Sequence, residues 1–232
     1  NNTGANNTAL GVAALRLNTS GGYNVAVGEN ASQWSTVAQL TTAIGYGAAQ
    51  GTSGYQNVGG VYLGYQSGHS VATGSDYNTL LGFEAGYGVS SGYGNTLIGA
   101  NTDFASNIST GHNNIGIGYD VAFPSATGNN QLNIGGILFG TLPATTTAFK
   151  LPTTGAIGIG TSSPYARLSI QANNGGTQNT LFAIASSTAS ATTTLLAVLN
   201  SGNVGIGTAA PSSLLDIRSG GVQYNSASLV SV

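Results

Sequence analysis

Short apolar segments, each ending in a glycine, recur at nearly constant spacing along the first 140 residues. The glycines are Gly11, Gly28, Gly45, Gly64, Gly82, Gly99, Gly118 and Gly135, and neighbouring ones lie 17 to 19 residues apart. A large aliphatic residue precedes each of them: Leu10, Val27, Ile44, Leu63, Leu81, Ile98, Ile117 and Ile134. Eight copies of one unit at this spacing indicate a repeat protein.

Alternation inside the unit predicts a short strand. Two residues before each aliphatic stands a mostly β-branched residue: Thr8, Val25, Thr42, Val61, Thr79, Thr96, Ile115 or Leu132. Positions two apart share one face of a strand, so we expect both columns to stack into a continuous core ridge. The residue between them is smaller in the first copies, as at Ala9, Ala26 and Ala43.

The residues after the strand suit a tight turn and a narrow interior. Three positions beyond the glycine lies a mostly small column: Ala14, Ala31, Ala48, Ser67, Ala85, Thr102 and Val121. We expect the glycine to take a positive φ or to allow close backbone approach. A unit of 17 to 19 residues is too short for helical repeats, which need about 33–47 residues. The pattern therefore predicts an all-β fold in which residues 1–140 form a β-solenoid of eight coils.

The period changes near residue 140. Residues 144–149, 155–164 and 168–170 recur 47 positions later as 191–196, 202–211 and 215–217. Residues 180–184 and 194–198 are expected to pair as the arms of a β-hairpin. We therefore expect two 47-residue β-hairpin repeats over 141–232. Their strands are short and sparse, so this half is expected to need partner chains to bury its apolar side chains.

Composition excludes several function classes. Only 4% of the 232 residues are charged, and the four Lys and Arg residues are scattered, which argues against nucleic-acid binding and against a polybasic membrane surface. The sequence has no apolar run of about 18 residues, so no helical membrane insertion is expected in this segment. Without cysteine there is no disulfide or thiolate metal site. Because the chain opens within a repeat and shows no signal peptide at Asn1, we expect it to be part of a longer protein.

Candidate chemistry is sparse. The Gly-x-Gly segments at 116–118, 158–160 and 205–207 lack the helix and the acidic residue of a dinucleotide site, so they are interpreted as turns. His69 and His112 are expected to be exposed turn residues, and Asp103 and Asp120 are two isolated carboxylates in neighbouring coils. We therefore expect no catalytic residue, no cofactor and no metal, and a protein that is not an enzyme.

Aromatic residues form two columns along the repeat. Tyr46, Tyr65, Phe83 and Tyr119 follow four of the eight glycines, and Tyr23, Tyr55, Tyr77 and Tyr93 precede strands. These columns have two interpretations: a stabilising ladder of rings in neighbouring strands, which we favour, or a glycan-binding strip, for which Tyr46, Tyr65, Phe83 and Tyr119 are the candidate residues.

The repeat at residues 3–15, copied at 20–31, resembles the repeats of phage tail-fibre-like and bacterial surface-fibre proteins. It is also similar, with a longer period, to the head repeats of trimeric autotransporter adhesins. Residues 202–217 look like the segment that often precedes a self-cleaving chaperone in such fibres. The resemblance implies a parallel homotrimer with intertwined β-prism segments.

The function expected from this resemblance is that of a structural shaft in an extracellular fibre, on a cell surface or a virion. Its expected partners are copies of itself and a cell-surface glycan or protein receptor. The main alternative is a solenoid module that binds glycans through its Tyr columns. An ice-binding solenoid is disfavoured because Val25 and Val61 interrupt the threonine column, and a polysaccharide-cleaving enzyme would need a carboxylate pair in a groove.

Overall fold

The computed structural model describes residues 3–103, 108–142, 155–172, 180–187 and 192–218. Within these ranges the protein is all-β, with 15 strands and no helix. The chain forms two compact units, Asn1–Ser169 and Ile170–Val232, which we call the solenoid unit and the hairpin unit. Within the solenoid unit, the N-terminal run of parallel strands ends with β8 (Gln131–Ile134), close to the position at which the sequence repeat changes.

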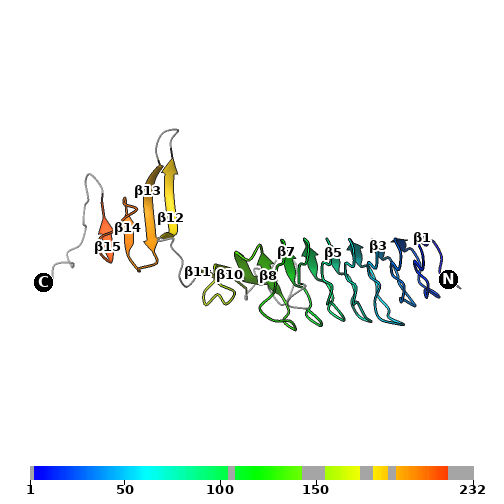
Figure 1. The fold of residues 1–232 in the computed structure, drawn as a ribbon. Coiled ribbons are helices and arrows are strands. Elements are labelled where there is room, and N and C mark those ends of the chain that lie inside the picture. Colours follow the sequence, from blue (N-terminus) through cyan, green and yellow to red (C-terminus); the bar gives the residue numbers. More distant parts are fainter. Residues whose placement is uncertain (1–2, 104–107, 143–154, 173–179, 188–191, 219–232) are drawn as a thin grey trace. The chain divides into compact units, whose positions relative to one another are not determined.

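One sheet runs through the whole solenoid unit (Figure 1). Its first seven strands are β1 (Thr8–Leu10), β2 (Val25–Val27), β3 (Thr42–Ile44), β4 (Val61–Leu63), β5 (Thr79–Leu81), β6 (Thr96–Ile98) and β7 (Ile115–Ile117). Each strand from β1 to β8 pairs in parallel with the next, which confirms a β-solenoid. The sheet continues with β9 (Leu138–Thr141), β10 (Ala156–Ile159) and β11 (Leu168–Ile170), where β9 is antiparallel to β8 and to β10.

The face of each strand that points into the core is the opposite of the predicted face. The middle residue of each strand points inward, and Ala26, Ala43, Tyr62, Leu80 and Leu97 are all fully buried. The residues on either side of it point outward. The predicted core ridge of Leu10, Val27, Ile44, Leu63, Leu81, Ile98, Ile117 and Ile134 is therefore wrong for the single chain, because these side chains are exposed or only partly buried. The columns do share a face, as predicted, but it is the outer one.

The interior is narrow and is filled mainly by small side chains. The predicted small column is confirmed, since Ala31, Ala48, Ser67, Ala85 and Thr102 are fully buried. In the later coils Leu80, Leu97, Val71, Val89 and Ile108 enlarge the core. Where the inward position is Gly116, the Phe123 ring takes its place, because a Cβ on Gly116 would lie 2.8 Å from the Cζ of Phe123.

A buried asparagine ladder joins the coils, and our sequence analysis did not predict it. It comprises Asn7, Asn24, Asn78, Asn95 and Asn114, each four residues before a repeat glycine. The Oδ1 of Asn95 accepts hydrogen bonds from the backbone N–H of Asn114, at 2.9 Å, and from its Nδ2, at 3.1 Å. The Nδ2 of Asn95 donates to the carbonyl of Gly111 at 2.9 Å. The ladder thus satisfies backbone groups that the three-residue strands leave unpaired.

The ladder is interrupted at Thr41 and at Gly60, and the second interruption lies beside Tyr62, the largest inward side chain of the strands. Gly60 stands in place of asparagine, and a Cβ there would lie within 3.0 Å of the Tyr62 ring. The Tyr62 hydroxyl donates to the carbonyl of Ser75 at 3.1 Å and accepts from the Nδ2 of Asn57 at 3.4 Å. Tyr62 therefore supplies the hydrogen bond to the next coil that an asparagine side chain makes elsewhere.

Left-handed residues form the corners of each coil. Three positions of the repeat are left-handed in most coils: the position five before the glycine and the positions two and four after it. The left-handed residues at these positions have φ values between +47° and +68°. The first of these columns is Asn6, Tyr23, Leu40, Gly59, Tyr77, Gly94, Asn113 and Asn130. Repeating one unusual conformation at fixed positions lets consecutive coils superimpose and pair along their whole length.

The hairpin unit holds a separate four-stranded sheet of β12 (Thr180–Ser187), β13 (Thr192–Leu199), β14 (Val204–Ile206) and β15 (Leu215–Ile217). The antiparallel pairing of β12 with β13 confirms the predicted hairpin arms. Strand β14 is antiparallel to β13 and parallel to β15. Residues 144–149, the first segment of the first long repeat, lie outside the described residues.

Candidate functional site

The outward face of the solenoid sheet carries a row of exposed or half-buried apolar side chains. Across β1 to β8 it presents two side chains per coil: Thr, Val, Ile or Leu first, and a large aliphatic second. The same face extends to β9 and β10, because Ile134 pairs with Leu138 and Leu138 pairs with Ile159. Exposed apolar surface that continues over neighbouring strands is typical of a surface that binds another polypeptide.

The hairpin unit repeats this arrangement on its own sheet. Register places one face in line across the four strands: Phe182, Ile184, Leu196, Val198, Val204, Ile206, Leu215 and Ile217. The opposite face carries Ala183, Ala197, Gly205 and Asp216 at the intervening positions. Among the described hydrophobic side chains of these strands, only Ala197 is buried, and it lies on the opposite face. The apolar face therefore lacks a covering layer within the described part of the unit.

The repeat glycines are required by backbone geometry. From Gly11 to Gly118 their φ values lie between +125° and +140°, where side chains are rarely found, and Gly135 has a φ of +60°. From Gly11 to Gly99, a Cβ would also lie under 3.0 Å from the carbonyl oxygen of the next repeat glycine. Both expectations for these residues, positive φ and close approach, are confirmed.

Three of the predicted aromatic residues form a stacked ladder. The ring centroids of Tyr46 and Tyr65 are 5.4 Å apart, those of Tyr65 and Phe83 are 5.1 Å apart, and the planes differ by 12° and 8°. Tyr119 is separated from this ladder by Ala100, which holds the same position in the intervening coil. A pyranose ring packs its C–H groups on an open aromatic face, and stacking occupies these faces. The geometry thus favours the stabilising interpretation for Tyr46, Tyr65 and Phe83.

The second aromatic column is not a single column. Tyr55 is fully buried, and burial raises the pKa of its hydroxyl; its Oη donates to the carbonyl of Ala49. Tyr23 and Tyr77 occupy the left-handed position five residues before a glycine, and Tyr93 lies one position earlier. The ring of Tyr93 stacks on His112 with a centroid distance of 4.5 Å.

The histidines are half-buried rather than exposed, because each ring stacks on a tyrosine of a neighbouring coil. His69 lies 4.7 Å from the Tyr87 ring, and burial lowers its pKa, although the nearby Glu84 carboxylate acts in the opposite direction. Its Nδ1 is buried and has no hydrogen-bond partner among the described residues. Protonation of His69 is therefore disfavoured in the folded protein.

The carboxylates do not assemble into a catalytic or metal-binding group within the described ranges. Asp103 is buried, and its Oδ2 accepts a hydrogen bond from the backbone N–H of Ile108. Asp216 lies beside Arg218, whose guanidinium lowers the carboxyl pKa to about 2. No cluster of three potential metal ligands occurs among the residues described, and a search of the same residues finds no helix able to cross a membrane.

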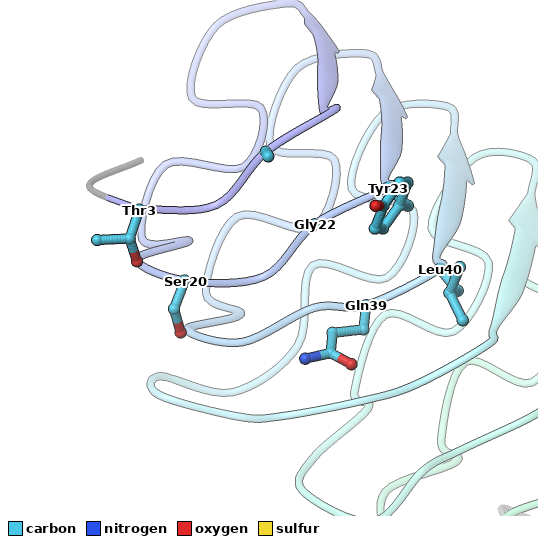
Figure 2. A pocket seen from close by; sticks show the side chains of 7 residues that line it. Thr3, Ser20, Gly22, Tyr23, Gln39 and Leu40 are labelled. Carbon is cyan, nitrogen blue, oxygen red and sulfur yellow. The ribbon is translucent and has the colours of Figure 1, made fainter.

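A hollow of about 410 Å³ lies at the corner of the first three coils (Figure 2). It is lined by Thr3, Ala5, Ser20, Gly22, Tyr23, Gln39 and Leu40. No lining residue is charged. Tyr23 and Leu40 are both left-handed and expose 65% and 61% of their surface. The alternation of residues within strands does not predict this hollow, because the hollow is formed by the corners between strands.

Comparison with models of protein families, with curated proteins and with solved structures finds no match to this chain.

Proposed function

We propose that this chain is a segment of an extracellular structural fibre, in which three parallel copies associate through the outward faces of their sheets. The fibre would stand on a cell surface or a virion and hold a receptor-binding part away from its base, with a cell-surface glycan or protein as receptor. The role is mechanical rather than enzymatic. The observation that carries the proposal is the continuous aliphatic face that a single chain leaves exposed.

Energetics support association through this face. The solenoid unit has its own buried cluster, so its exposed aliphatics are not needed to close the coil. Burying apolar surface gains roughly 25 cal/mol per Å². No charged residue occurs at the outward positions of β1 to β8, so covering them leaves no ion without its water shell. The hairpin unit adds a second apolar face, which copies of the chain would cover in intertwined, prism-like segments.

The number of copies is taken from the resemblance of the repeats to trimeric surface fibres. The sheet itself supports the parallel arrangement, since side-by-side copies in one direction keep every coil opposite an equivalent coil. The low charge content is compatible with such packing.

Neighbouring leucines provide the test. A double variant, Leu81→Asp with Ile98→Asp, places carboxylates on the outward face, whereas Leu80→Asp places one in the core of the same strand. Light scattering after size exclusion should give a wild-type mass near three times 22.9 kDa. The outward variant should fall to the mass of one chain and retain the circular dichroism of a β-solenoid, because only association requires that face.

Leu80→Asp is the matched control and should lose that circular dichroism, because it buries an unpaired charge inside the coil. A compact wild-type monomer would contradict the fibre proposal and favour a binding solenoid that acts alone. So would an outward double variant that keeps the mass of three chains.

A further inference from the structure

The corner before the strands carries large apolar residues in a conformation that suits glycine or asparagine. Tyr23, Leu40 and Tyr77 have φ values of +61°, +54° and +56°. The same column has glycine at Gly59 and Gly94. For a bulky side chain this conformation is sterically strained. We call these three residues the corner strip.

Burial does not offset this cost. Leu15 is also left-handed, but only 6% of its surface is exposed, so packing in the core accounts for it. The residues of the corner strip are 65%, 61% and 64% exposed. The coil needs a left-handed backbone at this corner but not a bulky side chain, since Gly59 and Gly94 serve there. Strained residues cluster at binding sites, which gives these three side chains a candidate role.

The residues of the corner strip lie at the same corner of the second, third and fifth coils. The Tyr77 ring reaches back over Gly59, since a Cβ on Gly59 would lie 2.8 Å from the Cδ1 of Tyr77. This places the Tyr77 ring against the coil of Gly59, which is the coil next to that of Leu40. Tyr23 and Leu40 lie in adjacent coils and both border the hollow (Figure 2).

Polar groups accompany this apolar strip. The hollow contains the hydroxyls of Thr3 and Ser20 and the carboxamide of Gln39 (Figure 2). The side chains of Ser20 and Gln39 have no protein hydrogen-bond partner in the described part of the chain, and both residues are exposed. A few uncharged donors and acceptors beside an aromatic ring suit a ligand that combines hydroxyls with C–H faces.

We infer that the hollow and the corner strip form a binding site for a neutral oligosaccharide that lies along the coils. Tyr23, and Tyr77 farther along, would pack against sugar rings, while Ser20 and Gln39 would bind sugar hydroxyls. The absence of charge among the lining residues selects uncharged sugars over sialylated or sulfated ones. This site differs from the stacked ladder of Tyr46, Tyr65 and Phe83, and it depends on the solenoid unit alone.

The experiment uses an array of neutral oligomers of glucose, mannose, galactose and N-acetylglucosamine, together with sialylated and sulfated glycans. The full chain should bind neutral oligomers, and titration calorimetry with the tightest one gives the Kd. Tyr23→Gly should weaken binding at least about tenfold. The same variant should melt at an equal or higher temperature, because glycine relieves the strained φ. A gain in stability with a loss of binding is not expected of a residue whose role is structural.

Gln39→Ala should also weaken binding, while Tyr46→Ala should leave the Kd unchanged, because Tyr46 lies in the other column. Three results would each overturn the inference: no binding to any neutral oligomer, unchanged binding by Tyr23→Gly, or a lower melting temperature of that variant. A lower native mass for Tyr23→Gly would assign the strip to contacts between copies and would likewise overturn it. Failure of the fibre proposal would instead appear as a monomeric wild type, whatever its glycan binding.

Discussion

The repeat glycines combine two constraints at one position. In Gly64 the φ of +140° disfavours any side chain, and a Cβ would contact the backbone carbonyl of Gly82. A flexible neighbour could move aside, but this carbonyl belongs to the next coil. The glycine column therefore fixes how closely the coils stack, and we expect it to be the position of the repeat least tolerant of substitution.

Replacing Gly64 with Ala should destabilise the solenoid unit by about 3–5 kcal/mol, the combination of backbone strain and overpacking. Gly54→Ala is the matched control, because its φ is +79° but no atom lies within 4 Å of its Cβ position. Only strain acts there, and the loss should be about 1–2 kcal/mol. Urea unfolding followed by circular dichroism measures both variants. Equal losses would show that close approach at Gly64 contributes nothing.

At the scale of the single coil, the ladder of buried asparagines makes hydrogen bonds between coils that longer strands would make with their backbones. Each described strand from β1 to β7 has only three residues. Asn95 is fully buried, and its amide contacts backbone groups of its neighbours in the next coil. A single side chain thus holds the turn before the strand in register with the coil that follows.

Asn95→Ala should cost about 2–4 kcal/mol, because it leaves the buried N–H of Asn114 and the carbonyl of Gly111 without partners. Asn129→Ala removes an exposed hydrogen bond to the N–H of His112 and should cost less than about 1.5 kcal/mol. The midpoint of urea unfolding compares them. If Asn95→Ala were no more harmful than Asn129→Ala, water would be able to replace the ladder.

The sequence predicted the coils, the small column, the hairpin arms and the geometry of the glycines, because each has a local pattern. It did not predict which side of the strand faces inward. A period of two defines both faces equally well, and a shift of one residue exchanges them. Large aliphatics suggested a core, yet Ala26 and Ala31 indicate an interior too narrow for leucine in the early coils. The hollow and the corner strip arise from left-handed turns, which alternation within strands does not reveal.

At the scale of the whole molecule, the two units differ in how they are stabilised. The buried cluster of the solenoid unit spans its coils, so one chain can hold this fold. The hairpin unit exposes large residues such as Phe182, Ile184 and Ile206 on a single sheet. A four-stranded sheet with one uncovered apolar face is only marginally stable in water. Folding of the hairpin unit should therefore depend on association.

On dilution, the two units should differ in the hydrogen exchange of their backbone amides. As the concentration falls below that needed for association, amide protons of β12 to β15 should lose protection, while those of β3 to β7 should keep it. The physical reason is that the solenoid unit has its own buried cluster, whereas the apolar face of the hairpin sheet would be covered only by the proposed association of copies. Loss of protection in both sheets at the same concentration would contradict this difference, and so would its retention in both.

The hydrogen bonds between coils run along the direction in which the coils stack, and this has a mechanical consequence. A pull along that direction loads the contacts of one coil at a time, as in unzipping, rather than all of them together. A coil that opens gives up about 4.8 Å of stacked length and releases a loop of 17 to 19 residues, which extends to roughly 60 Å. We therefore expect the stacked coils to yield under tension by releasing chain one coil at a time, rather than by breaking all of their contacts at once.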